Sequence, residues 1–143
     1  MKRKIAIVGD LHFGLKDSSP SYFAYQKKFF DDVLVPECKK HGVTDIVFLG
    51  DLFHSRNVLS IRMFHDVRNL FLDLKANGFE CYALLGNHDI CYKNSYEVNS
   101  AKMLLGDMFF WTGSDGYLVQ GNCVLFDWRN SREEYLELFE RVK

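Results

Sequence analysis

Three short polar segments carry the side chains best suited to chemistry. They are Asp10-Leu11-His12, Gly50-Asp51 and Gly86-Asn87-His88-Asp89. Together they offer carboxylate, amide and imidazole groups, a donor set that suits manganese, iron or zinc better than a soft metal that seeks thiolates. The pattern predicts a divalent metal site assembled from separate parts of the chain.

Each polar segment follows a short apolar run. The runs are Ile5–Val8, Asp45–Leu49 and Cys81–Leu85. Near-continuous apolar runs are typical of strands that are covered on both faces in an α/β sheet. Ligands of such sheets gather outside the carboxyl ends of the strands, where glycine lets the chain turn sharply. We therefore expect the three polar segments to meet at one edge of one sheet.

Residues of all three segments could serve as ligands of metal ions. Asp10 and His12 are two positions apart, so in extended backbone their side chains would point to the same side while Leu11 points into the protein. Asp51 would bridge to a second ion, which would also bind the amide oxygen of Asn87. A pair of ions about 3.5 to 4 Å apart can hold a phosphoryl group and activate a water molecule.

Taken alone, each segment also has a purely structural explanation. An Asp-x-His triplet at a strand end usually serves turn or capping chemistry, and a Gly-Asp pair is weaker still. The three segments in order, at similar strand ends, favour the metal site. Asp10 and Asp51 beside buried strands would also cost several kcal/mol unless a cation or a hydrogen-bond donor compensates them.

Length and composition are those of one domain, residues 1–143. The chain is 48% hydrophobic and 15% aromatic, enough for a packed core. Its formal charge of -1 excludes a globally basic surface for nucleic acid, so phosphate contacts would need local Lys and Arg residues or bound metal. The four cysteines lack the spacing of a structural zinc site, and no signal peptide or membrane span is evident. We expect free thiols, a cytoplasmic location and no membrane contact.

Two helices are expected between the apolar runs. The first covers roughly residues 22–41, where Pro36 should kink or divide it and Gly42 should end it. The second begins at the N-cap Ser60, repeats apolar residues at spacings of three and four, and stops at Gly78.

The last third of the chain predicts smaller elements. Residues 94–105 are polar and should form a loop with a short helix, followed by short strands at 108–111, 117–119 and 123–128. Ser131 and Glu134 form a capping box for a final helix. The apolar stripe of that helix consists of Tyr135, Leu138, Phe139 and Val142.

The order and content of the polar segments resemble the calcineurin-like metallophosphoesterases. Gly50-Asp51-Leu52-Phe53-His54 is similar to the SbcD-type DNA-repair nucleases, and Gly86-Asn87-His88-Asp89 followed by Tyr92-Lys93-Asn94 is similar to phage recombination endonuclease subunits of that family. Protein serine/threonine phosphatases, which typically have Glu in place of Asp89, are a weaker match. The resemblance implies the α/β class, with a metallophosphoesterase β-sandwich flanked by helices.

The resemblance also implies two divalent ions, most often manganese. Asp10, His12 and Asp51 match the ligands of one ion, and Asp51 with Asn87 match ligands of the second. In the family the site is completed by histidines further along the chain, whereas the last histidine here is His88. The second site is therefore expected to be weak, and the chain to resemble only the N-terminal portion of the family's domain, truncated before the last ligand motifs.

His88 matches the family's general acid and His54 its supporting histidine. An imidazole beside a metal ligand is well suited to protonate the leaving oxygen of a phosphodiester. For His54 an ordinary hydrogen-bonded histidine is the alternative explanation, and for His41 and His65 it is the preferred one.

Two basic residues and two tryptophans are of types that can contact nucleic acid. Arg56 and Lys93 lie on loops that leave the ligand-bearing strand ends, where they would either contact DNA phosphates or stay in solvent as surface charges. Trp111 and Trp128 are expected in the core rather than as platforms for bases.

The favoured function is a metal-dependent phosphodiesterase or DNA nuclease of the SbcD type, acting in recombination or repair and inactive alone if its second ion is poorly held. The alternative is a catalytically silent interaction module on the same fold, and the third choice is a protein serine/threonine phosphatase. The implied partners are DNA, an SbcC-type ATPase, and a second copy or second polypeptide that completes the domain. A phage-encoded protein of this kind would act in the host cytoplasm.

Overall fold

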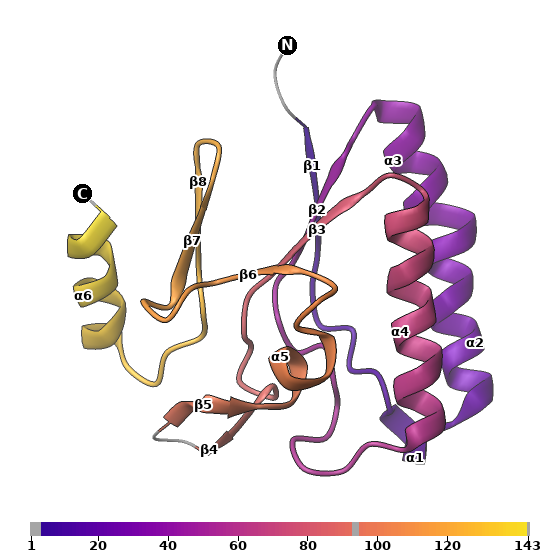
Figure 1. Ribbon diagram of the computed structural model, residues 1–143, viewed down its shortest axis with the longest axis horizontal. Helices are drawn as coiled ribbons and strands as arrows, with labels where there is room; N and C mark the ends of the chain where they lie inside the picture. Colours follow the sequence, from indigo (N-terminus) through magenta and orange to yellow (C-terminus); the bar gives the residue numbers. More distant parts are fainter. Residues whose placement is uncertain (1–3, 93–94, 143) are drawn as a thin grey trace.

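A parallel sheet forms the centre of the molecule (Figure 1). The computed structural model describes residues 4–92 and 95–142. In spatial order the strands are β1 (Ile5–Val8), β2 (Asp45–Phe48), β3 (Glu80–Ala83) and β6 (Phe110–Trp111). Val8, Phe48 and Ala83 stand side by side in the register, so the first three strands end at the same level. The predicted α/β class is confirmed.

Helices cover one face of this sheet (Figure 1). They are α2 (Pro20–Phe29), a π-helical turn η1 (Phe30–Leu34), α3 (Val35–His41) and α4 (Ile61–Ala76). The predicted division of the first helix is confirmed, because Pro36 lies in the first turn of α3, which follows the π turn, and Gly42 ends the helix with a φ of 63°. Ser60 caps α4 by accepting a hydrogen bond from the amide of Met63 at 3.1 Å.

Aromatic rings dominate the core between the sheet and these helices. Phe71 of α4 packs edge-on against Phe48 of β2, with ring centroids 5.4 Å apart, and against Phe109, with centroids 4.6 Å apart. Phe13 and Phe53, which follow the first two strands, are also fully buried in this core. Large rings in such geometry supply much of the burial that stabilises a fold of this size.

The other face of the sheet is only partly covered. The hairpin of β7 (Tyr117–Gln120) and β8 (Cys123–Phe126) and the helix α6 (Arg132–Val142) lie on this side (Figure 1). β2 is buried along its whole length, but Ile7 of β1 is 60% exposed and Leu49 after β2 is 45% exposed. The expectation that the runs are covered on both faces is therefore wrong for β1, which is an edge strand.

One sequence-based assignment fails beyond β3. Residues 95–99, predicted as part of a polar loop, form β5 (Ser95–Asn99), which pairs antiparallel with β4 (Ile90–Tyr92). Pairing with β4 decides the conformation here, because the polar composition carries no strand signal of its own. The short helix predicted in this region is confirmed as α5 (Ser100–Leu105), capped by Asn99 through the amide of Lys102 at 2.8 Å.

The capping box of α6 forms only in part. Ser131 accepts a hydrogen bond from the amide of Glu134 at 3.2 Å, as predicted. The carboxylate of Glu134, however, accepts the hydroxyl of Tyr96 at 2.6 Å and so ties α6 to β5. All four cysteines are free, and none of the helices in the described segments is long and apolar enough to cross a membrane.

Candidate metal centre

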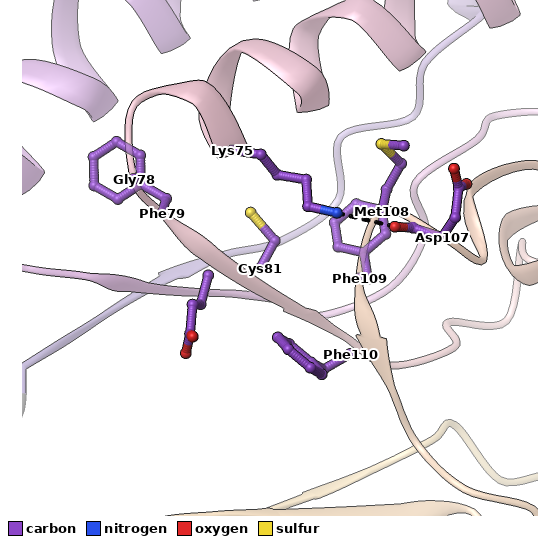
Figure 2. Close-up of a pocket in the computed structure, with 9 residues that line it drawn as sticks. Lys75, Gly78, Phe79, Cys81, Asp107, Met108, Phe109 and Phe110 are labelled. Atoms are coloured by element: carbon purple, nitrogen blue, oxygen red, sulfur yellow. Dashed lines mark hydrogen bonds between the residues drawn. The ribbon is translucent and has the colours of Figure 1, made fainter.

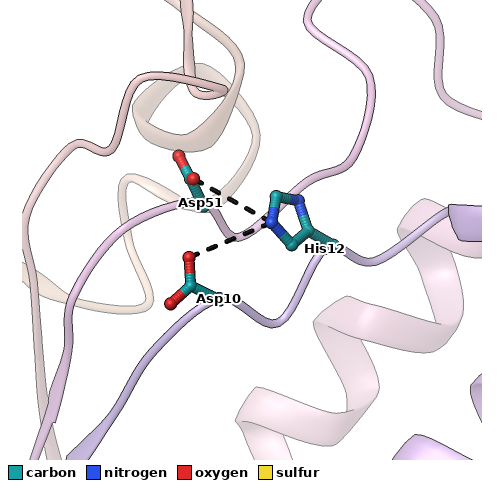
Figure 3. A group of neighbouring side chains, drawn as sticks. All are labelled: Asp10, His12 and Asp51. Atoms are coloured by element: carbon teal, nitrogen blue, oxygen red, sulfur yellow. Dashed lines mark ion pairs between the residues drawn. The ribbon is translucent and has the colours of Figure 1, made fainter.

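The structure brings the first two polar segments together at the carboxyl ends of β1 and β2. Ligand atoms of Asp10, His12 and Asp51 all lie within 4.8 Å of one another. Nε2 of His12 is 3.9 Å from a carboxylate oxygen of each aspartate (Figure 3). The three groups converge because the parallel register ends both strands at the same level.

The backbone at Asp10, His12 and Asp51 is left-handed, so the extended conformation expected for Asp10 and His12 is wrong. The φ angles are 54° at Asp10, 47° at His12 and 50° at Asp51. Such conformations cost roughly 1 to 2 kcal/mol per non-glycine residue and persist only where the surroundings enforce them. Three ligand candidates therefore share a strained conformation.

Hydrogen bonds and burial hold the strained segments in place. The amide of His12 donates to the carbonyl of Asp51 at 2.9 Å, and the amide of Phe13 donates to the carbonyl of Leu52 at 2.7 Å. Phe13, Leu52 and Phe53 are fully buried and anchor both loops in the core. Polar residues and buried apolar anchors thus lie close together in both loops.

Two glycines let the second and third segments touch. A Cβ atom at Gly50 would lie 2.6 Å from the Cα of Gly86, and one at Gly86 would lie 2.8 Å from Cγ of Asp51. Gly50 also has a φ of 85°, which favours glycine. No larger residue fits at either position without moving the backbone.

Asp89 is a structural residue of the centre that the sequence reasoning used only to identify the family. Its buried carboxylate accepts hydrogen bonds from the amides of Asp51 at 2.7 Å, Leu52 at 3.0 Å and Gly86 at 2.9 Å. Burial, together with the nearby charge of Asp51, raises the pKa of Asp89 to about 6, although the amide hydrogen bonds oppose this shift. The side chain binds the β2 loop to the β3 loop.

The donor set fits a divalent cation. The side chain of Asp51 is only 12% exposed, whereas that of Asp10 is 79% exposed. Among the described residues, His12 is the one potentially cationic side chain within ion-pair distance of either carboxylate. A cation would compensate the partly buried charge, and one imidazole with two carboxylates suits manganese, iron or zinc.

Three imidazole rings lie together beside the carboxylates. The ring centroid of His12 is 4.9 Å from that of His88 and 5.7 Å from that of His54. Nδ1 of His88 is 3.2 Å from the carbonyl oxygen of His54. Because a carbonyl only accepts, Nδ1 carries the proton, and Nε2 is the nitrogen of neutral His88 that can gain one. His41 and His65 lie on the exposed surfaces of α3 and α4.

Of the remaining site candidates, Asn87 and Arg56 lie near the centre in the structure. Asn87 is held next to the centre, because the amide of its neighbour His88 donates to Oδ1 of Asp51 at 2.8 Å. Asn87 and Arg56 line one cavity of about 280 Å³. Lys93 lies outside the described residues.

A larger cavity, of about 430 Å³, opens at the opposite end of the sheet (Figure 2). Its lining includes Lys75, Cys81 and Phe110. Burial raises the pKa of Cys81 to about 12, so this thiol is not a nucleophile at neutral pH. Nζ of Lys75 donates to the carbonyl of Asp107 at 3.0 Å. This cavity therefore has no convergent reactive groups.

Comparisons with known proteins agree with this geometry. The family model described as Calcineurin-like phosphoesterase matches residues 3–142. Exonuclease subunit 1 of Enterobacteria phage T4 is 28% identical over 102 residues, which is 71% of this chain and 30% of the phage protein. The match thus spans less than a third of that relative.

Proposed function

Because the chain belongs to the calcineurin-like phosphoesterase family, we propose that it is a metal-dependent phosphodiesterase domain that acts on DNA. The observation that carries the proposal is the convergence of Asp10, His12 and Asp51 within 4.8 Å, with two further imidazoles alongside. A phosphodiester needs charge neutralisation and a proton for its leaving oxygen. The chain offers groups for both at one edge of the sheet.

Asp10, His12 and Asp51 would hold one manganese ion, and Asp51 with Asn87 would contribute to a second. Divalent ions at such a centre polarise a phosphoryl oxygen and lower the pKa of bound water. Water, a substrate phosphate or another chain would supply the remaining ligands of the second ion. We therefore expect one strong and one weak site.

His88 would act as the general acid. Its Nε2 is the nitrogen that takes up a proton, while its Nδ1 is hydrogen-bonded to the carbonyl of His54. That contact fixes the ring and its tautomer, so His54 would act as a positioning residue through its backbone. Proton transfer from a positioned side chain typically contributes 10² to 10⁴ in rate.

DNA is the proposed substrate because the phage relative is an exonuclease subunit and because Arg56 adjoins the centre. We propose an SbcD-type role in recombination or repair, in the cytoplasm of a host if the gene is carried by a phage, with an SbcC-type ATPase as partner. The exposed Ile7 and Leu49 support association with a second copy or a second polypeptide.

A silent binding module on the same fold is the second candidate. Its support is the small number of ligands for the second ion among the described residues, namely Asp51 and Asn87. Such a module would still bind manganese but would not hydrolyse phosphodiesters.

Manganese titration calorimetry combined with hydrolysis assays tests these proposals. We expect one strong manganese site in the wild-type chain and slow hydrolysis of bis-p-nitrophenyl phosphate, faster than that of the monoester p-nitrophenyl phosphate. His88→Ala should leave manganese affinity unchanged and lower the hydrolysis rate by about 10² to 10⁴. The matched control is His65→Ala, on the exposed surface of α4.

Failure to bind manganese would refute the metal centre. Manganese binding without hydrolysis of either ester at any manganese concentration would favour the silent module. Preferential hydrolysis of the monoester would favour a phosphatase.

A further inference from the structure

The cavity beside Asn87 is lined by aromatic, apolar and basic side chains, unlike the metal centre. It measures about 280 Å³ and is lined by Arg56, Asn87, Ile90, Tyr92, Trp128 and Asn130. The cavity opens directly beside the metal centre, because the residues on both sides of Asn87 contact Asp51. A substrate phosphate at the centre would therefore place one of its two substituents next to this cavity.

Trp128 provides an aromatic wall in a fixed position. Its amide donates to the carbonyl of Leu85 at 2.7 Å, and the amide of Leu85 donates in turn to Oδ1 of Asp127 at 2.7 Å. These bonds fix the segment after β8 to the carboxyl end of β3. Trp128 is half-buried and lies outside the hydrophobic core, whereas Trp111 packs against that core. The prediction that both tryptophans are core residues is thus wrong for Trp128.

Arg56 adds a cation to the same cavity. Sγ of Cys91 donates to the backbone carbonyl of Arg56 at 3.2 Å, which holds the loop against β4. Within the described part of the chain, the guanidinium of Arg56 has neither a hydrogen bond nor an ion pair, so it is available to a ligand. Arginine combines an affinity for phosphate with stacking on flat rings.

We propose that this cavity binds the nucleoside attached to the phosphate at the metal centre, with its base against Trp128 and a phosphate near Arg56. This inference rests on the proposed function and extends it, because it assigns the residues that recognise the nucleotide. Ile90 gives an apolar surface, and Asn130, whose amide donates to the hydroxyl of Tyr96 at 3.2 Å, adds a polar wall. A volume of about 280 Å³ is slightly below the range for small-molecule sites, roughly 300 to 1,000 Å³, and suits a ligand no larger than a single base with its sugar.

Aromatic stacking predicts a contact that tolerates any base. Each base stacked on an aromatic side chain contributes an amount that corresponds to a loss of about fivefold to 150-fold in affinity when the ring is removed. The cavity would therefore distinguish a nucleotide from a bare sugar phosphate without reading its sequence.

Binding of deoxyadenosine 5′-monophosphate tests the inference against 2-deoxyribose 5-phosphate, a ligand with the same phosphate and sugar but no base. Both are titrated calorimetrically into the full chain at a fixed manganese concentration. We expect the nucleotide to bind at least about fivefold more tightly. In a Trp111→Phe background, where Trp128 is the one remaining tryptophan, nucleotide but not sugar phosphate should quench the fluorescence.

Two substitutions separate ring stacking from folding. Trp128→Leu should weaken nucleotide binding by about fivefold to 150-fold and leave sugar phosphate binding unchanged, whereas Trp128→Phe should retain most of the affinity. Trp111→Phe is the matched control and should change neither affinity.

Equal affinity for the two ligands, or equal nucleotide affinity of wild type and Trp128→Leu, would overturn the inference. The proposed function is judged separately, because manganese and sugar phosphate binding do not require the base. Loss of those two would refute the metal centre, while their persistence without any preference for the base would refute the cavity alone.

Discussion

The two ends of the central sheet differ in how the chain uses strain. At the carboxyl end, Asp10, His12 and Asp51 adopt left-handed backbone conformations, and Gly50 and Gly86 approach more closely than any side chain would allow. At the amino end, Gly78 has open space around it and the cavity of about 430 Å³ brings no reactive groups together. The candidate site thus lies at the end where polar groups are forced together.

The two ends of the sheet also differ in how their carboxylate charges are compensated. At the amino end the guanidinium of Arg68 holds the pKa of Asp107 below its usual value through a direct hydrogen bond. At the carboxyl end, His12 is the one potentially cationic side chain of the described residues within ion-pair distance of Asp10 or Asp51. The protein itself neutralises the carboxylate at the amino end, whereas a bound cation would neutralise those at the carboxyl end.

The largest expected effect is on folding. Gly50→Ala should lower the free energy of unfolding by about 2 to 5 kcal/mol, because the new Cβ would overlap Gly86 and the residue would be held at positive φ. Gly78→Ala, with a similar φ of 87° but open surroundings, should cost only about 1 to 2 kcal/mol. Urea denaturation measures both. Equal losses would show that the close contact of the two loops is not required.

Metal affinity should show the next largest effect. Asp51→Asn keeps the shape of the side chain but removes a charge, so the affinity for manganese should fall by at least about 100-fold, more than outer-shell substitutions usually cause. Asp107→Asn is the matched change at the amino end and should leave the affinity unaltered. Calorimetric titration that finds the two variants alike would refute the difference between the ends.

Asp127, which binds the hairpin to the end of β3, predicts a pH dependence of stability. Burial raises the pKa of this carboxyl, although Thr112, Lys102 and Arg129 oppose the shift. The folded state then holds the proton more tightly than the unfolded state. The contribution of Asp127 is therefore greatest below the ordinary pKa of aspartate and falls as pH rises toward the folded value, by at most about 1.4 kcal/mol per pH unit.

Denaturation of wild type and Asp127→Asn at a series of pH values isolates this contribution. The difference between the two should vary with pH in the weakly acidic range, with wild type losing stability relative to the variant as pH rises. A difference that stays constant would mean that Asp127 has the same pKa in both states.

The smallest effect is expected on the open face of the sheet, away from either end. Ile7→Ser should change the free energy of unfolding by no more than about 0.5 kcal/mol, because Ile7 is largely exposed. If the uncovered face mediates association, the substitution should nevertheless reduce oligomer formation in light scattering. An unchanged oligomeric state would place the contact elsewhere.

Periodicity and glycine placement were enough to predict the strands of the central sheet, the main helices and the edge at which the polar segments meet. Near-continuous apolar runs and N-caps such as Ser60 are local signals, so they survive in the sequence. The left-handed backbone at Asp10 and His12 could not be predicted, because it depends on hydrogen bonds to the β2 loop. For the same reason β5 and the position of Trp128 could not be predicted, because they depend on pairing with β4 and on the hydrogen bond to Leu85.

The structural role of Asp89 could not be inferred from the sequence motif alone. A sequence presents this residue as a neighbour of His88, whereas the fold uses its carboxylate to join two loops through three amides. The signal that could have revealed it is its place after a glycine turn, where a buried acid needs amide partners.

The register of the strands determines how far apart the ligands of the metal centre lie. Val8, Phe48 and Ala83 are aligned, and each residue of a strand advances the chain by about 3.3 Å. A one-residue insertion in β2 would shift Asp51 by that distance and turn alternate side chains to the opposite face. Transplanting this centre into another protein would therefore require the alignment of the strands as well as the loops. The loops alone do not determine the distances between the ligand side chains.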